Sequence, residues 1–91
     1  MAALDLLGRR SALRVLWELR AEAMTFRVLQ DAAGTNPSLL NTRLKEFRDA
    51  GLVEHVGSGY CLTAVGRQLL SALEPLSEWA QRWGSSTMPE R

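Results

Sequence analysis

Between residues 36 and 52 the apolar and polar positions repeat with the period of an α-helix. Leu40, Leu44 and Phe47 recur at i, i+4 and i+7, which places all three on one side of a helix. The positions that point elsewhere are Asn41, Thr42, Lys45 and Arg48. The pattern predicts a helix over about residues 37–50, with one face in the core and the other polar, small and basic.

The residues at both ends of this segment suit helix termini. Asn36 can cap the free amides of the first turn with its side-chain oxygen, and Pro37 lacks an amide that would have no partner there. Gly51 can supply a left-handed stop, and Leu52 falls where such a cap places an apolar contact on Phe47. We therefore expect the helix to end at Gly51.

A second predicted helix comes directly before the first. Thr25 can cap a helix over residues 26–33, and Gly34 can close it. Only three residues, one of them a glycine, then remain before Pro37. Two helices joined by such a turn are typical of the helix-turn-helix unit of DNA-binding proteins. This is the strongest local pattern in the chain.

The N-terminal part is apolar and predicted to be helical. Residues 2–7 suit one or two helical turns that end at Gly8. Residues 11–21 predict a helix with an apolar face broad enough for burial on more than one side. That face is formed by Leu13, Leu16 and Trp17, with Val15 and Leu19 beside them. We expect this segment to be the central helix.

After Gly51 the pattern changes from the helical period to short β-type runs. Residues 52–56 and 60–62 flank Gly57 and Ser58, which suit a two-residue hairpin turn with positive φ at its first position. A hairpin directly after a helix-turn-helix unit is a wing.

A long last helix is predicted over residues 64–83, capped by Thr63 and stopped at Gly84. Its main apolar stripe is Val65, Leu69, Leu73, Leu76, Ala80 and Trp83. Pro75 removes one backbone hydrogen bond inside this helix, so we expect a kink or a break into two helices. Residues 85–91 are expected to form a flexible tail, which leaves residues 1–84 as a single domain.

This last helix carries more apolar surface than a small domain can cover. Leu70 and Trp79 lie off the main stripe, so two faces of the helix are apolar. Large exposed apolar patches usually mark an interface. We therefore expect a homodimer through this helix and residues 2–7. The expected contacts are Leu4, Leu7, Leu69, Leu73, Leu76, Trp79 and Trp83.

Composition narrows the class of protein. With 91 residues, 46% of them hydrophobic, the chain suits one small domain for which a partner subunit is expected. No apolar run is long enough to span a membrane, and charged residues interrupt the N-terminal stretch, so a cytoplasmic location is expected. Cys61 and His55 are the only cysteine and histidine, which excludes an internal disulfide and argues against a zinc site. Without a catalytic constellation or a phosphate-binding glycine loop, we expect neither a cofactor nor enzymatic activity.

The formal net charge of +1 hides an uneven distribution. Residues 9–49 contain eight basic side chains against five acidic ones, and the remainder is slightly acidic. Such a surplus suits a modest nucleic-acid footprint, although a solvated helical surface gives the same count.

The order of these elements resembles the winged helix-turn-helix transcriptional regulators, most closely the HxlR family, a relative of the MarR group. The resembling segments are residues 8–19 (GRRSALRVLWEL), 40–53 (LNTRLKEFRDAGLV) and 60–66 (YCLTAVG), together with Thr25, Phe26, Leu29 and Trp79. The resemblance covers nearly the whole chain. It implies a mainly α fold with a small β-hairpin, of the α+β class, and a bacterial homodimeric regulator that binds double-stranded DNA.

The chain departs from the family pattern in three places. Ser11 stands where the family has a tryptophan, and the family's N-terminal cysteine has no counterpart, so sensing through that cysteine is not implied. The wing is shorter than usual, and residues 54–62 contain no Lys or Arg with which a wing normally reaches DNA. No small-molecule effector is indicated.

The functional interpretation of residues 37–50 is insertion into the major groove. The expected DNA contacts are Ser38, Asn41, Thr42 and Arg43 toward bases, Lys45 and Arg48 toward phosphates, and Arg27 toward a phosphate at the groove edge. Arg43 lies beside the apolar stripe and could instead pair with Glu46 or Asp49. Arg27 could equally be a solvated surface residue.

Two functions stay open on the sequence. One is a homodimeric regulator on a two-fold symmetric operator, which the basic helix favours. The other is a winged-helix protein-interaction module that no longer binds DNA, which the short uncharged wing and the near-neutral charge favour.

Overall fold

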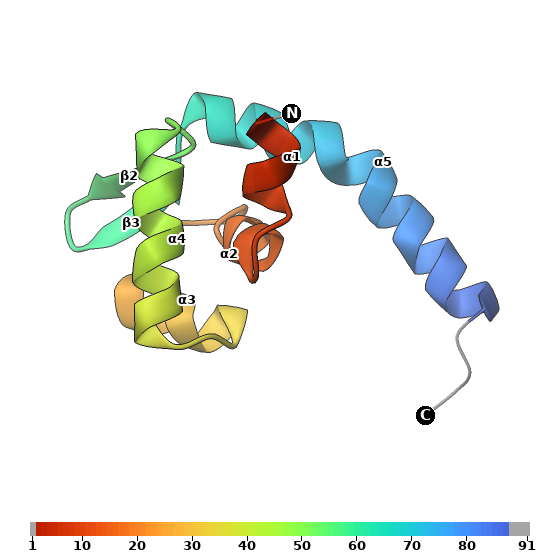
Figure 1. Ribbon diagram of the computed structural model, residues 1–91, viewed down its shortest axis with the longest axis horizontal. Helices are drawn as coiled ribbons and strands as arrows, with labels where there is room; N and C mark the ends of the chain where they lie inside the picture. Colours follow the sequence, from red (N-terminus) through yellow and green to blue (C-terminus); the bar gives the residue numbers. More distant parts are fainter. Residues whose placement is uncertain (1, 88–91) are drawn as a thin grey trace.

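The computed structural model describes residues 2–87 and is mainly helical, with a small antiparallel sheet (Figure 1). The helices are α1 (Ala2–Leu7), α2 (Ala12–Glu18), α3 (Phe26–Ala33), α4 (Pro37–Asp49) and α5 (Ala64–Thr87), and the strands are β1 (Met24–Thr25), β2 (Val53–Val56) and β3 (Gly59–Leu62). The predicted winged helix-turn-helix fold is confirmed, with α3 and α4 as the helix pair and β2 and β3 as the wing.

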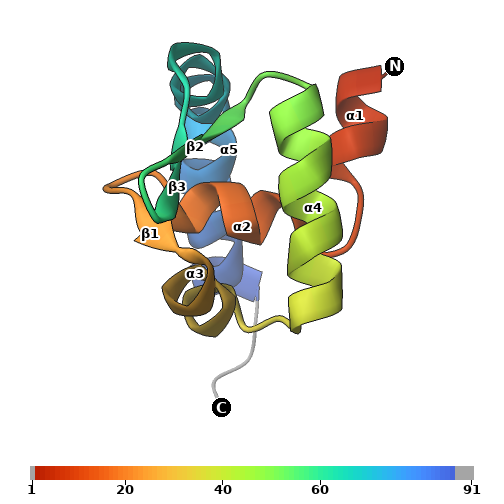
Figure 2. The same ribbon diagram turned by 90° about the vertical axis from the view of Figure 1, so that its left-hand side faces the viewer.

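Helix α2 lies at the centre of the domain, as predicted. It contacts α1, α3, α4 and α5, and Figure 2 shows these elements arranged around it. Its Ala12, Val15 and Leu16 are completely buried. The buried side chains that share this core from α3 and α4 are Leu29, Ala33, Leu40, Leu44 and Phe47.

The two helices of the helix-turn-helix unit are capped by the residues that the sequence predicts. The Thr25 hydroxyl accepts a hydrogen bond from the Val28 amide at 3.3 Å, and the Asn36 side-chain oxygen accepts one from the Leu39 amide at 2.8 Å. Gly34 ends α3 in the left-handed conformation, with φ 65°. These local contacts fix where both helices begin and how the chain turns between them.

The end of α4 is also confirmed. Gly51 has φ 78°, its amide donates to the Arg48 carbonyl at 3.1 Å, and the Leu52 amide donates to the Phe47 carbonyl at 2.9 Å. This pair of bonds is a Schellman cap, which satisfies carbonyls that the helix leaves free. It also brings Leu52 into the core.

The sheet contains the predicted hairpin and one strand that was not predicted. The strand order is β1-β3-β2, and His55 of β2 pairs with Tyr60 of β3. Gly57 takes φ 58° at the first turn position, as expected. Strand β1 joins the other edge of β3, where Met24 pairs with Tyr60.

Helix α2 is shorter than the predicted helix over residues 11–21. It begins at Ala12 because Ser11 adopts a left-handed conformation, with φ 66° and no side-chain capping bond. It ends at Glu18 because the chain must turn back to place Met24 beside β3. The ends of α2 are thus set by the turn before it and the sheet after it.

The conformation of Ser11 yields a prediction about stability. Ser11→Gly should raise the free energy of unfolding by up to about 1 kcal/mol. A left-handed backbone costs a residue with a Cβ roughly 1–2 kcal/mol, and glycine avoids this cost but loses more backbone entropy on folding, which offsets part of the gain. Urea denaturation at fixed protein concentration would measure it. Ser11→Ala, which keeps the Cβ, is the control, and a glycine variant less stable than the alanine variant would contradict the prediction.

Helix α5 differs from the predicted helix at its C-terminal end. Of the two outcomes expected from Pro75, a kink or a break, the helix shows no break, and Figure 1 shows that it bends along its length. It also passes Gly84 and reaches Thr87, because nothing in this segment imposes the positive φ of a helix stop. Of the expected tail, residues 85–87 belong to α5, and residues 88–91 lie outside the described residues. Within the described part, no helix combines the length and apolar character needed to cross a bilayer.

The packing face of α5 also differs from the predicted stripe. Leu70 is buried in the core, whereas Val65, at the head of the stripe, is 55% exposed. The start of α5 explains this rotation. The Thr63 hydroxyl donates to the Gly51 carbonyl at 2.6 Å and accepts from the Gly66 amide at 3.0 Å. Gly66 is thereby pressed against the Leu52 carbonyl, and a Cβ on Gly66 would lie 2.2 Å from that oxygen.

Candidate nucleic-acid interface

The outward face of α4 is formed by the side chains that do not enter the core. Leu40, Leu44 and Phe47 are buried, and at about 100° per residue the opposite face falls on positions between them. The exposed residues on that face are Ser38, Asn41, Thr42, Lys45, Arg48 and Asp49. The helix therefore presents amide, hydroxyl, cationic and carboxylate groups to solvent immediately after the three-residue turn.

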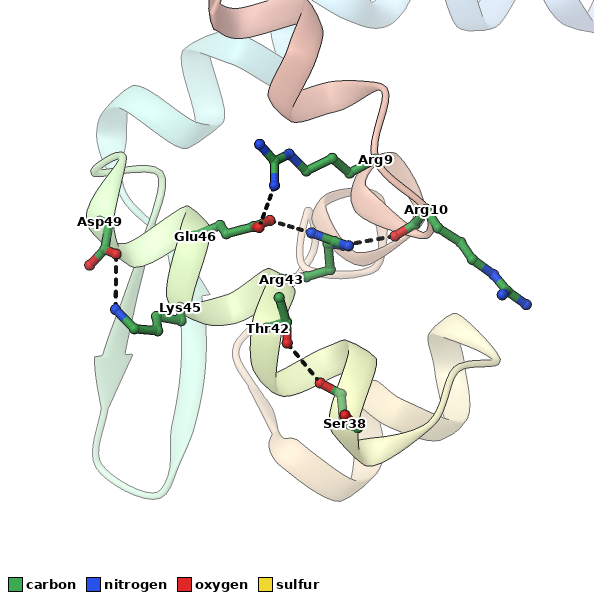
Figure 3. Close-up of polar contacts among 8 residues, drawn as sticks. All are labelled: Arg9, Arg10, Ser38, Thr42, Arg43, Lys45, Glu46 and Asp49. Atoms are coloured by element: carbon green, nitrogen blue, oxygen red, sulfur yellow. Dashed lines mark hydrogen bonds and ion pairs between the residues drawn. The ribbon is translucent and has the colours of Figure 1, made fainter.

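The polar groups on this face differ in their availability. The Thr42 hydroxyl donates to the Ser38 carbonyl at 3.1 Å, which leaves the hydroxyl oxygen able to accept a further hydrogen bond (Figure 3). Within residues 2–87, the Asn41 amide has no intramolecular hydrogen bond. Asn41 can therefore offer both a donor and an acceptor to a base edge.

The two expected phosphate contacts also differ. Lys45 lies 3.2 Å from the Asp49 carboxylate in an exposed pair, so DNA would compete with Asp49 for it. Exposed pairs of this kind contribute at most about 1 kcal/mol, so the competition is weak. Arg48 has no ion pair among the described residues. It is the cation of α4 most available to a phosphate.

Arg43 does not lie on the outward face. Its Nε donates to the Arg10 carbonyl at 2.9 Å, a terminal nitrogen pairs with Glu46, and the side chain is only 11% exposed. The expectation that Arg43 faces bases is therefore not supported, and the alternative of pairing with Glu46 is confirmed. The physical reason is the Arg10 carbonyl, which gives the guanidinium a second partner inside the chain.

A hollow of about 630 Å³ separates α4 from the wing. The helix lines it with Asn41, Lys45 and Arg48, and the wing with Glu54, His55 and Tyr60. The rings of His55 and Tyr60 stack with centroids 4.6 Å apart. The pairing of β2 with β3 places His55 beside Tyr60, a neighbour that the separation of the two residues in the sequence does not indicate. All Lys and Arg side chains that line the hollow come from α4.

The geometry of this helix pair and wing agrees with a comparison of the sequence with protein families. The model of the HxlR-like helix-turn-helix family matches residues 6–88. The chain belongs to the HxlR-like helix-turn-helix family. Its function is that of a DNA-binding transcriptional regulator.

Individual relatives of this HxlR-like protein agree with the assignment. An uncharacterized HTH-type transcriptional regulator of Methanocaldococcus jannaschii is 25% identical over 95 residues, which cover 99% of this chain and 90% of that one. Quinone-bound YodB from B. subtilis superposes with a TM-score of 0.83 at 26% identity, covering 89% of this chain and 93% of YodB. A MarR family transcriptional regulator from Silicibacter pomeroyi shares the fold, with a TM-score of 0.78 at 24% identity and coverage of 94% and 68%.

Arg27 is the last of the residues expected to contact DNA. It is exposed in the first turn of α3, and within residues 2–87 its side chain has no hydrogen bond or ion pair. The structure therefore leaves both expectations open, a phosphate contact and a solvated arginine.

The residues expected at the dimer interface divide into two groups. Leu7, Leu69 and Leu73 are partly buried against the protein's own core. The others are largely exposed: Leu4 at 64%, Leu76 at 54%, Trp79 at 52% and Trp83 at 47%. The rings of Trp79 and Trp83 stack with centroids 5.9 Å apart on the part of α5 that extends away from the body (Figure 1). Between this helix and α2 runs an apolar hollow of about 330 Å³ that includes Leu13 and Trp17.

Proposed function

We propose that the protein acts as a homodimer that binds a two-fold symmetric operator, with α4 of each protomer in the major groove of one half-site. The observation that carries the proposal is the exposed polar face of α4 directly after the helix-turn-helix turn. In this arrangement Ser38, Asn41 and Thr42 meet base edges, and Lys45 and Arg48 meet phosphates. Arg27 meets a phosphate at the edge of the groove.

The dimer contact in this proposal is the apolar surface of α1 and the far half of α5. Support comes from Leu4, Leu76 and Trp79, which are each more than half exposed in one protomer. An isologous contact between two copies of this surface would produce the two-fold axis that an operator with symmetric half-sites requires. Such a regulator works in the cytoplasm and needs no catalytic group.

The phosphate contacts can be tested through the salt dependence of binding. Arg48→Ala should weaken binding to all duplexes alike and flatten the log-log salt slope by about 0.9, the value for one phosphate neutralised. Fluorescence anisotropy on a duplex from the region upstream of the protein's own gene, at several salt concentrations, measures this slope. Arg20→Ala is a matched control, because it removes the same charge from an exposed side chain on the Trp17 ring.

The outcome also separates the regulator from the interaction module. If the parent protein shows no salt-dependent binding to any duplex, the operator model is wrong and the module is adopted. If the parent binds but Arg48→Ala leaves the slope unchanged, Arg48 does not contact a phosphate.

A further inference from the structure

The two flanks of α4 have different surroundings. Asn41 and Arg48 lie on the flank that borders the wing. Arg43 and Glu46, one turn apart, lie on the other flank and face the turn of residues 8–11 that joins α1 to α2 (Figure 3). The second flank is therefore the place where the N-terminal part of the chain meets the DNA-binding helix.

A single carboxylate organises this contact. One oxygen of Glu46 pairs with Arg43, and the other accepts from the terminal nitrogen of Arg9 at 2.8 Å. The Arg43 Nε reaches the Arg10 carbonyl at 2.9 Å. We call these four groups, Arg9, the Arg10 carbonyl, Arg43 and Glu46, the Glu46 clamp.

The clamp holds a turn that is conformationally constrained. The Arg10 carbonyl belongs to the peptide unit directly before Ser11, whose φ is 66°. Such a backbone persists only where surrounding contacts over-determine it. Further backbone bonds continue toward α1, from the Arg9 amide to the Leu6 carbonyl at 3.3 Å and from the Gly8 amide to the Leu4 carbonyl at 2.9 Å. A continuous set of polar contacts thus joins α1 to the middle of α4.

We propose that Glu46 is a positioning residue for DNA binding, which fixes the orientation of α4 relative to α1 through Arg9 and Arg43. The inference rests on the proposed function, because α1 belongs to the proposed dimer contact and the clamp would make dimer geometry set the angle of α4. In this role Arg9 influences DNA affinity without neutralising a phosphate.

The direction in which one substitution changes DNA affinity separates a positioning role from a simple effect of charge. Glu46→Gln removes a negative charge from α4, so charge alone would tighten binding to DNA. Loss of positioning weakens it, on the order of fivefold. Glu22→Gln is the matched control, since it makes the same substitution at an exposed residue of the loop between α2 and β1, away from α4 and from the clamp. It should leave affinity unchanged or slightly higher.

The experiment measures anisotropy titrations with a duplex that the parent protein has selected from a random pool. The variants are Glu46→Gln, Arg9→Gln and both together, at a temperature where circular dichroism shows every variant fully folded. We expect each single variant to bind DNA about fivefold more weakly, with an unchanged salt slope. The double variant should bind no more weakly than the single variant with the lower affinity. The Arg9 side chain is 51% exposed, so Arg9→Gln should stay folded and can still be measured even if Glu46→Gln unfolds.

Three results would overturn the clamp. They are Glu46→Gln binding as tightly as Glu22→Gln, additive losses in the double variant, and a salt slope flattened by about 0.9 in Arg9→Gln. Sedimentation of the parent protein tests the proposed dimer separately. A parent that selects no duplex or remains a monomer contradicts the proposed function, whereas a dimeric parent with selective binding and neutral clamp variants contradicts only the clamp.

Discussion

Gly66→Ala is expected to lower the free energy of unfolding by about 3 kcal/mol, the upper part of the usual range for overpacking a buried site. The new Cβ would lie 2.2 Å from the Leu52 carbonyl oxygen and 3.1 Å from its carbon. That carbonyl cannot easily move, because it accepts a hydrogen bond from the Thr63 amide at 3.0 Å, and the Leu52 amide completes the cap of α4. Relief would require α5 to shift away from the end of α4.

Urea denaturation followed by tryptophan fluorescence measures this loss. Protomer concentration must be held constant, because association stabilises the folded state. Gly84→Ala is the matched control: it lies in α5, a Cβ there meets nothing within 4 Å, and alanine favours a helix by roughly 0.5–1 kcal/mol over glycine. Equal stability of the two variants would show that α5 does not approach Leu52 this closely.

Trp79→Ala should weaken the proposed homodimer at least about 30-fold, which corresponds to the roughly 2 kcal/mol lost at an interface hot spot. Trp79 is 52% exposed in the protomer and stacks on the next aromatic ring of α5, so a partner would cover a large flat apolar surface there. Analytical ultracentrifugation over a range of concentrations gives the dissociation constant.

The control for this variant is Val28→Ala, which shortens an apolar side chain of similar exposure on α3. It should dimerise like the parent. A Trp79→Ala protein that dimerises as tightly as the Val28→Ala protein would place the interface elsewhere. A parent that sediments as a monomer at micromolar concentration would contradict the dimer itself.

The helix-turn-helix unit could be predicted from the sequence because its determinants are local. Thr25 and Asn36 cap amides within their own first turns, and Gly51 takes the positive φ that its position at the helix end requires. Such signals act between residues a few positions apart. They therefore have the same meaning in the isolated sequence and in the folded domain.

Features that depend on distant partners could not be predicted. Strand β1 has only two residues, too few for any period, and it exists because β3 offers a free edge to Met24 and Thr25. The face that α5 buries could not be read from spacing, since both of its apolar stripes have the helical period. The contact of Gly66 with the Leu52 carbonyl fixes the rotation that buries Leu70.

The candidate site divides in the same way. The outward position of Asn41 and Lys45 follows from the helical period alone. For Arg43 the sequence left two partners open, bases or acidic neighbours. The deciding acceptor is a backbone carbonyl of Arg10, and no side-chain pattern reports where a distant carbonyl will lie.

Strand β1 also has a consequence for how the chain folds. Thr25 both ends β1 and caps α3, and its partner Gly59 lies in the strand that follows the whole helix-turn-helix unit and β2. Pairing β1 with β3 therefore closes a loop that contains α3, α4 and β2. The chain must lose the conformational entropy of closing this loop before its long-range contacts form. This long-range pairing raises the contact order of an otherwise helical domain. We expect α4 to acquire its fixed position only in the same cooperative step that completes the sheet.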